Sequence, residues 1–118
     1  MSAGAIHSHF EQPTSFVFTD ESMAKVNELI AKYPKGRQAS AVMGLLWLAQ
    51  QQHDNWIPEK AMEEIARLLD MPKIKVYEVA TFYTMYNLAP RGTHHLQFCT
   101  TTPCWLRGSA DVVSACEK

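Results

Sequence analysis

The first 90 residues carry apolar side chains at helical spacing, in segments separated by proline and glycine. In the first segment, Thr19 precedes Asp20 and Glu21. This order is typical of a helix start, because a hydroxyl caps free N–H groups and acids favour the positive helix end. Pro34 and Gly36 then interrupt the pattern. The spacing between these signals predicts a helix.

Three more segments show the same periodicity. One runs from about Gln38 to Gln52, and the next two open at Pro58 and Pro72. Proline suits the first turn of a helix, where its missing N–H is not needed. The last segment includes the nearly all-apolar run VATFYTMY, which is typical of a helix buried among its neighbours. We therefore expect a bundle of four helices over residues 16–90.

The pattern changes after Gly92. The run HHLQFC alternates and predicts a strand, and Pro103 opens a helix that is expected to continue through Val113. A single strand and helix cannot bury their own faces. We therefore expect residues 91–118 to be the start of a larger α/β domain. The predicted fold is mostly α, with a short arm over residues 1–15 before the bundle.

Composition narrows the function classes. The 118 residues are 47% hydrophobic and 19% charged, which fits one packed domain or one domain and the start of another. The net charge of -1 disfavours a general nucleic-acid binder. Three cysteines without regular spacing do not resemble a secreted disulfide scaffold, so a reducing compartment is expected. The apolar run at residues 41–49 is shorter than the roughly 20 residues that cross a bilayer, so no direct membrane insertion is expected.

Cys99 and Cys104 lie in the run QFCTTTPCWLRGS, where the predicted strand meets the predicted helix. Thiolates of this C-x4-C spacing suit iron–sulfur ligation, and plant-type ferredoxins also begin with it. The alternative is that the two cysteines only fill space in a core. The spacing alone leaves both interpretations open.

Further ligands are hard to find in the sequence. Cys116 would lie about 18 Å along a continuous helix from Cys104, so we expect it to be a core residue. His95 is separated from Cys99 by roughly 13 Å of extended strand, which disfavours a shared zinc ion. A thioredoxin-like disulfide exchanger would favour C-x-x-C.

Residues 61–83 also have the rhythm of a helix-turn-helix, which keeps a DNA-binding module open as a different class of function. A recognition helix must present polar and basic side chains. Here only Lys73 and Lys75 could reach a phosphate, and the aromatic residues Phe82, Tyr83 and Tyr86 are expected to be core. DNA binding is therefore disfavoured.

Three features of the sequence together resemble the thioredoxin-like [2Fe–2S] ferredoxin subunits of respiratory NADH:quinone oxidoreductase, complex I. They are the run VYEVATFYTMY, then Pro90 and Gly92, and then the run CTTTPCWLRGS. The resemblance runs from about Phe16 to the last residue. It implies a helical bundle followed by a thioredoxin-like α/β domain, truncated here after its first strand and helix. In this family two cysteine pairs, C-x4-C and C-x3-C, hold the cluster. Cys99 and Cys104 match the first pair, and the second has no counterpart.

The resemblance also implies a role. Such a subunit has no catalytic residues of its own and exchanges single electrons with a flavin-bearing, NADH-oxidising subunit, where FMN and NAD bind. Other peripheral-arm subunits are further expected partners, on the cytoplasmic face of a bacterial inner membrane. A mitochondrial matrix location is disfavoured because residues 1–16 contain no arginine. Equivalent subunits of NAD-linked formate dehydrogenases or hydrogenases remain the alternative.

Hydrogen bonds to the sulfurs are expected to tune the potential of the cluster. The candidate donors are Thr100, Thr101 and Thr102, and Arg107 is a candidate for stabilising the reduced cluster. Trp105 stands where the family usually has a smaller or more flexible apolar residue.

Overall fold

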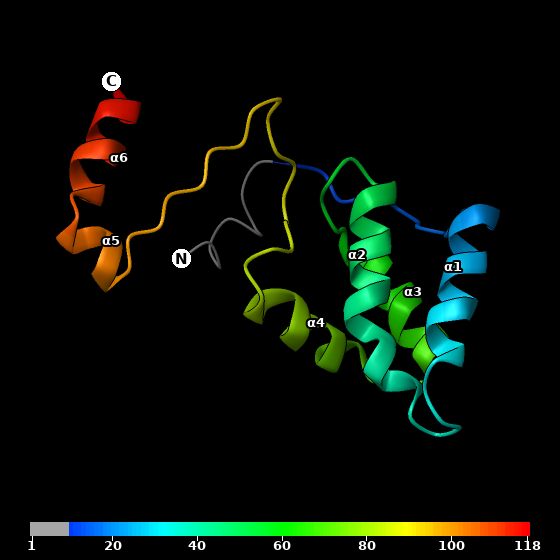
Figure 1. Cartoon of the computed structure of the whole chain (residues 1–118). Helices are drawn as coiled ribbons and strands as arrows, with labels where there is room; N and C mark the ends of the chain where they lie inside the picture. The colour runs from blue at the N-terminus through cyan, green and yellow to red at the C-terminus, as the bar shows by residue number, and fades with distance from the viewer. Residues whose placement is uncertain (1–9) are drawn as a thin grey trace.

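The computed structural model describes residues 10–118, so most of the predicted arm, residues 1–9, lies outside the described part. The helices of the bundle are α1 (Asp20–Ala31), α2 (Val42–Gln52), α3 (Glu59–Leu69) and α4 (Lys73–Phe82), with a short 3-10 turn, η2 (Gln38–Ala41), before α2. In Figure 1, α1, α2 and α3 lie together, and α4 packs beside α2 and α3. The prediction of a four-helix bundle is confirmed.

The core of the bundle draws on every one of these helices. Val26 of α1, Leu45 and Leu46 of α2, Ile65 of α3 and Val76 of α4 are fully buried in one cluster. This burial supplies the main driving force for folding, because it removes apolar surface from water. The cluster defines the face that each helix turns inward.

Side chains cap the starts of two helices of the bundle, α1 and α3. The Thr19 hydroxyl accepts a hydrogen bond from the Ser22 N–H at 3.3 Å, as the sequence pattern predicts. The start of α3 is capped from a distance: Gln12 Oε1 accepts a hydrogen bond from the Glu59 N–H at 3.0 Å. The described end of the arm is therefore joined to the bundle.

Gln50 and Asn87 are the polar residues buried with this core in the described part of the chain. Gln50 Oε1 accepts a hydrogen bond from the Asn87 N–H at 2.6 Å, and Gln50 Nε2 donates one to the Met85 carbonyl at 3.2 Å. The backbone carbonyl of Asn87 accepts a hydrogen bond from the Ile57 N–H at 2.7 Å, and Asn87 Oδ1 accepts one from Arg91 Nε at 3.2 Å. These bonds fix the place where the chain leaves the bundle.

The expectation for the end of α4 was partly wrong. The helix ends at Phe82, and Tyr83 has an extended backbone with ψ of 115°. Tyr86 is buried, and its hydroxyl donates to the Met43 carbonyl at 3.0 Å. Phe82 and Tyr83, by contrast, are 76% and 39% exposed. The early helix end changes the direction of the chain, so only Tyr86 reaches the core.

The C-terminal part differs more from the prediction. Within the described residues, HHLQFC forms no strand, and its side chains are exposed. A strand needs a neighbour to pair its backbone groups, and no described segment supplies one. The single predicted helix is also broken in two, α5 (Thr102–Leu106) and α6 (Ser109–Glu117). Gly108 separates them, at a φ of 100° that glycine adopts without strain.

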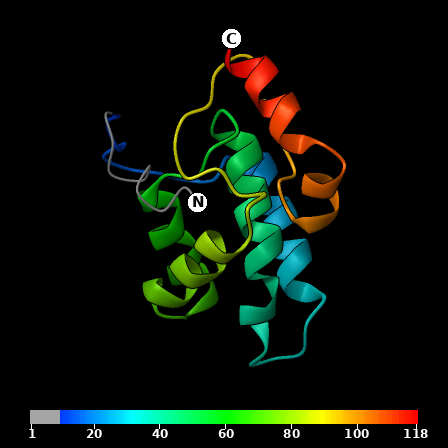
Figure 2. The ribbon, with the colours of Figure 1, turned by 90° about the vertical axis from the view of Figure 1, so that its left-hand side faces the viewer.

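Figure 1 shows α5 and α6 set apart from the bundle, at the end of a long segment without helix. In the turned view, the yellow part of this segment rises to a loop before the chain descends to α5 (Figure 2). The molecule is accordingly elongated, with extents of 50 × 31 × 25 Å. The boundary between a bundle at residues 16–90 and a second domain at residues 91–118 stays a prediction. None of the described helices is long and apolar enough to span a bilayer.

A chain shortened to end at Ala89 is expected to keep its helical structure. The buried cluster runs from Phe16 to Tyr86 and takes no residue from α5 or α6. Far-UV circular dichroism should therefore show a strongly helical spectrum with a cooperative thermal transition. The full chain is the control. A spectrum dominated by strand or by unfolded chain would contradict this expectation.

Candidate functional site

The loop around Cys99 and Cys104 joins the extended segment to α5. Thr101 is the N-cap of α5, and its carbonyl accepts a hydrogen bond from the Trp105 N–H at 2.9 Å. Pro103 lies in the first turn, as its sequence position predicts, and Cys104 follows it directly. This turn places both cysteines in one short loop, although five positions separate them in the sequence.

The two thiols differ in their tendency to ionise. Cys99 Sγ lies 3.0 Å from the Thr101 hydroxyl. The Thr101 hydroxyl is the largest influence that lowers the pKa of Cys99, followed by the Thr101 backbone and the neighbouring Cys104 thiol. The Cys99 thiol and its charge raise the pKa of Cys104. The pair therefore loses its first proton from Cys99, which makes a thiolate available at the exposed end of the loop.

Other residues do not join the pair. Among the described residues, no group of three or more cysteine, histidine or acidic side chains is placed to hold a metal ion. Cys116 lies near the end of α6 and is exposed, so the prediction of a core residue was wrong. The break at Gly108 also removes the continuous helix on which its expected separation of about 18 Å from Cys104 depended.

The donor set suits half of a two-iron cluster. Thiolates are the ligands that iron–sulfur clusters use, and a [2Fe–2S] cluster takes four ligands, two on each iron. Cys99 and Cys104 are free thiols at the two ends of one short loop, so they fit the two positions on one iron. The second iron needs two further ligands that the described residues do not bring to this loop.

The loop also distinguishes among the predicted hydrogen-bond donors. Of the three neighbouring threonines, Thr101 is the one whose hydroxyl contacts a cysteine sulfur. Arg107 ends α5, and its backbone N–H bonds to the Cys104 carbonyl at 3.1 Å. A role for the Arg107 side chain beside a reduced cluster stays a prediction.

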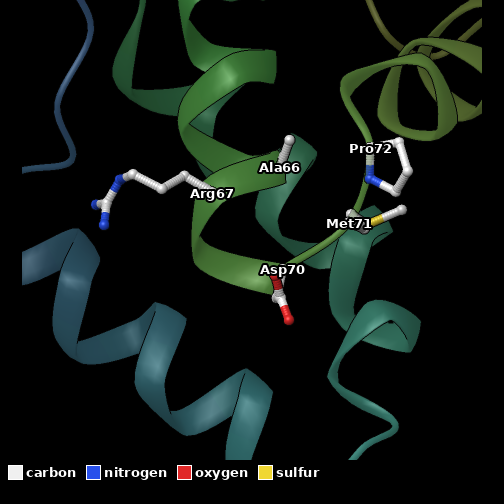
Figure 3. A pocket seen from close by; sticks show the side chains of 5 residues that line it. All are labelled: Ala66, Arg67, Asp70, Met71 and Pro72. Atoms are coloured by element: carbon white, nitrogen blue, oxygen red, sulfur yellow. The ribbon is translucent and has the colours of Figure 1, made fainter.

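Two surface hollows offer less chemistry. The first lies at the turn between α3 and α4, where the side chains of Arg67, Asp70 and Pro72 point in different directions (Figure 3). Arg67 is already bonded to Glu64, with Nε 2.9 Å from the carboxylate. The polar groups that line this hollow therefore do not converge on one point where a ligand could bind.

The second hollow lies where the chain leaves the bundle and is lined by Trp47, Gln50, Asn87, Arg91 and His95 among others. The polar groups of Gln50 and Asn87 are taken up by the bonds that hold this part of the chain. Sequence reasoning missed both residues. The available signal was the position of Gln50, one turn after Leu46 on the apolar face of α2.

Comparisons with known proteins cover most of the chain. Residues 26–118 match the model of the thioredoxin-like [2Fe-2S] ferredoxin family. The E-type NADH-quinone oxidoreductase subunit of Rickettsia conorii is 51% identical over 105 residues, which cover 89% of this chain and 63% of that protein. Its counterpart in Rickettsia bellii is 49% identical over the same shares. A counterpart in Rhizobium meliloti is 49% identical over 91% of this chain and 39% of its own length. The chain thus spans less than two thirds of the length of these relatives.

Proposed function

Because the chain belongs to the thioredoxin-like [2Fe–2S] ferredoxin family, we propose that it is an electron-transfer subunit of NADH:quinone oxidoreductase. In this role Cys99 and Cys104 hold one iron of a [2Fe–2S] cluster. The observation that carries the proposal is the place of both free cysteines in one short loop at the start of α5, within the matched range. The names of the similar proteins support the choice of this complex over a formate dehydrogenase or a hydrogenase.

The residues of the loop divide the work between binding and tuning. A bound [2Fe–2S] cluster supplies a carrier for one electron at a time. Cys99 and Cys104 would bind as thiolates, and the Thr101 hydroxyl, 3.0 Å from Cys99 Sγ, would then donate a hydrogen bond to that sulfur. A donor at this place stabilises negative charge on the sulfur, and so favours the reduced state of the centre that the sulfur ligates.

The partners follow from the same proposal. The electron comes from a flavin-bearing, NADH-oxidising subunit, which binds FMN and NAD, and other peripheral-arm subunits complete the assembly. Trp105 and Leu106 follow the ligand loop directly and are 62% and 70% exposed. Exposed apolar side chains beside a site support contact with a further protein surface. We place the assembly on the cytoplasmic face of a bacterial inner membrane.

Anaerobic reconstitution with iron and sulfide tests the proposal. The protein to use is the chain extended by a second cysteine pair, because the two thiolates of the described loop satisfy one iron only. Uptake of two irons per chain that depends on Cys99 and Cys104 is the expected result. A cluster that forms equally well without either cysteine would refute the ligand assignment.

Duplex DNA is expected not to bind at physiological salt. The two lysines at the start of α4 are already paired: Lys73 Nζ lies 2.9 Å from Glu63, and Lys75 Nζ lies 3.2 Å from Glu78. These acids would also repel phosphates, and the net charge is -1. Fluorescence anisotropy with labelled duplexes measures the binding. Submicromolar, sequence-dependent affinity would favour the helix-turn-helix interpretation instead.

A further inference from the structure

We propose that the loop after α1, residues 32–37, is a docking site for an acidic segment of another protein. This basic loop carries three exposed cations, Lys32, Lys35 and Arg37. In Figures 1 and 2 the loop between α1 and α2 projects from one end of the bundle, away from α5 and α6. It is therefore a contact surface separate from the cysteine loop, and the proposal does not depend on the cluster assignment.

The three cations of the basic loop have no ionic partner in the chain. No described carboxylate lies within ion-pair distance of them, and residues 1–9 contain no acid. Every lysine and arginine inside α1, α3 and α4, by contrast, is paired: the pairs are Lys25–Glu21, Lys60–Glu63, Arg67–Glu64, Lys73–Glu63 and Lys75–Glu78. Without the three loop cations the net charge would fall from -1 to -4. The loop is thus a positive patch on a chain that is otherwise acidic.

Hydrogen bonds hold the backbone of the basic loop in a tight turn. The Arg37 N–H donates to the Pro34 carbonyl at 2.9 Å, and Gly36 between them has a φ of 84°, which glycine adopts without strain. The Tyr33 N–H donates to the Ile30 carbonyl at 3.1 Å, which ties the start of the loop to α1. A backbone that is already fixed loses less conformational entropy when a partner binds.

The stability of the bundle does not account for these charges. Lys32 is the C-cap of α1, where a cation is favoured by the negative end of the helix. That effect falls off within the last turn, so it does not extend to Lys35 and Arg37. Three like charges within six residues repel one another, and an acidic partner removes that repulsion. Charge complementarity therefore identifies the occupant as a segment that carries carboxylates.

A protein partner fits the basic loop better than lipid or nucleic acid. Segments that bind anionic lipid carry about four to eight cations, often beside an apolar face that enters the bilayer. The loop has three cations, and its large apolar side chain, Tyr33, is only 41% exposed. Proteins that bind duplex DNA make about six to ten phosphate contacts. A few charges are enough between proteins, because they steer association and fix orientation.

Binding of a glutamate-rich peptide to the 118-residue chain tests the proposal. Amide NMR of the isotope-labelled chain follows the titration at low and at physiological salt, and a glutamine-rich peptide is the uncharged probe. The glutamate peptide should shift the amides of residues 32–38 most, whereas the glutamine peptide should leave them in place. The affinity should fall by more than about threefold at physiological salt, because exposed charges are screened.

Two triple variants of equal net charge separate the basic loop from overall charge. The loop variant combines Lys32→Gln, Lys35→Gln and Arg37→Gln. Its affinity for the glutamate peptide should fall by about tenfold, since three exposed ion pairs are lost. The control variant replaces lysines that are paired on the helices, and its affinity should change by less than about twofold; it combines Lys25→Gln, Lys60→Gln and Lys75→Gln.

Three results would overturn the proposal. They are equal losses in the two variants, shifts spread over all the exposed cations, and no shift with the glutamate peptide. Vesicles of phosphatidylglycerol test the lipid interpretation. Co-sedimentation of the parent chain at physiological salt that is lost in the loop variant would assign the basic loop to lipid and would also overturn the proposal. None of these results bears on iron binding by Cys99 and Cys104.

Discussion

Replacing Gln50 with leucine is expected to lower the free energy of unfolding by about 2 kcal/mol. The substitution removes the acceptor of the buried Asn87 N–H, at 2.6 Å, and the donor to the Met85 carbonyl. A buried N–H without a partner costs more than leucine recovers by burying its methyl groups. Urea unfolding followed by circular dichroism measures the change in stability.

Gln51→Leu is the matched control, since Gln51 is the next residue on α2 and is exposed. It makes the same chemical change on the solvent side of the helix and should alter stability by less than about 0.5 kcal/mol. In Gln50→Leu, the Asn87 amide should also exchange with deuterium faster than in the parent chain. Equal unfolding midpoints for the two variants would show that the Gln50–Asn87 contact does not stabilise the exit from the bundle.

The bundle was predictable because its signals are local. The Thr19 cap marks the start of α1. The periodic apolar positions specify each helix through contacts between residues three or four positions apart. The end of α4 was harder. VATFYTMY is apolar throughout, so the pattern does not show where the helix stops, and the turn at Tyr83 is what separates buried Tyr86 from exposed Phe82.

The sequence pattern alone could not show whether the run HHLQFC forms a strand. Alternation in HHLQFC shows that the segment would suit a sheet, but a strand exists only with a partner. The same limit applies to Gln50 and Asn87, which lie 37 positions apart and become partners only after the bundle folds. Long-range pairing of this kind leaves no trace in local periodicity.

The candidate site was predictable in part. The C-x4-C spacing predicts Cys99 and Cys104 as ligands, and the structure places both in one short loop as free thiols. The choice of Thr101 among three threonines depends on how that loop turns into α5, which spacing does not reveal. Cys116 was misjudged because α6 has no buried residue, so no core forms around this cysteine. The break before α6 was also missed, because it depends on a left-handed backbone conformation at Gly108 that glycine permits but does not require.

The 118-residue chain is expected not to hold a stable [2Fe–2S] cluster by itself, whereas a chain extended by a C-x3-C pair should hold one. Cys99 and Cys104 satisfy one iron, and the described residues bring no third ligand to the loop. The second iron would depend on ligands from water, small thiols or another chain, and these are weaker or less ordered ligands than a second cysteine pair in the same chain. Iron counting after anaerobic reconstitution, and electron paramagnetic resonance of the reduced sample, measure cluster content.

In the extended chain, Cys99→Ala or Cys104→Ala should abolish the stoichiometric signal, because each removes one of four ligands. Cys116→Ala is the matched control: it removes an exposed thiol of α6 and should leave iron content and the spectrum unchanged. Loss of the cluster in Cys116→Ala would make Cys116 a ligand and would require α6 to fold back on the loop. A full, stable cluster in the 118-residue monomer would contradict this ligand count, because the chain would then supply more cluster ligands than Cys99 and Cys104.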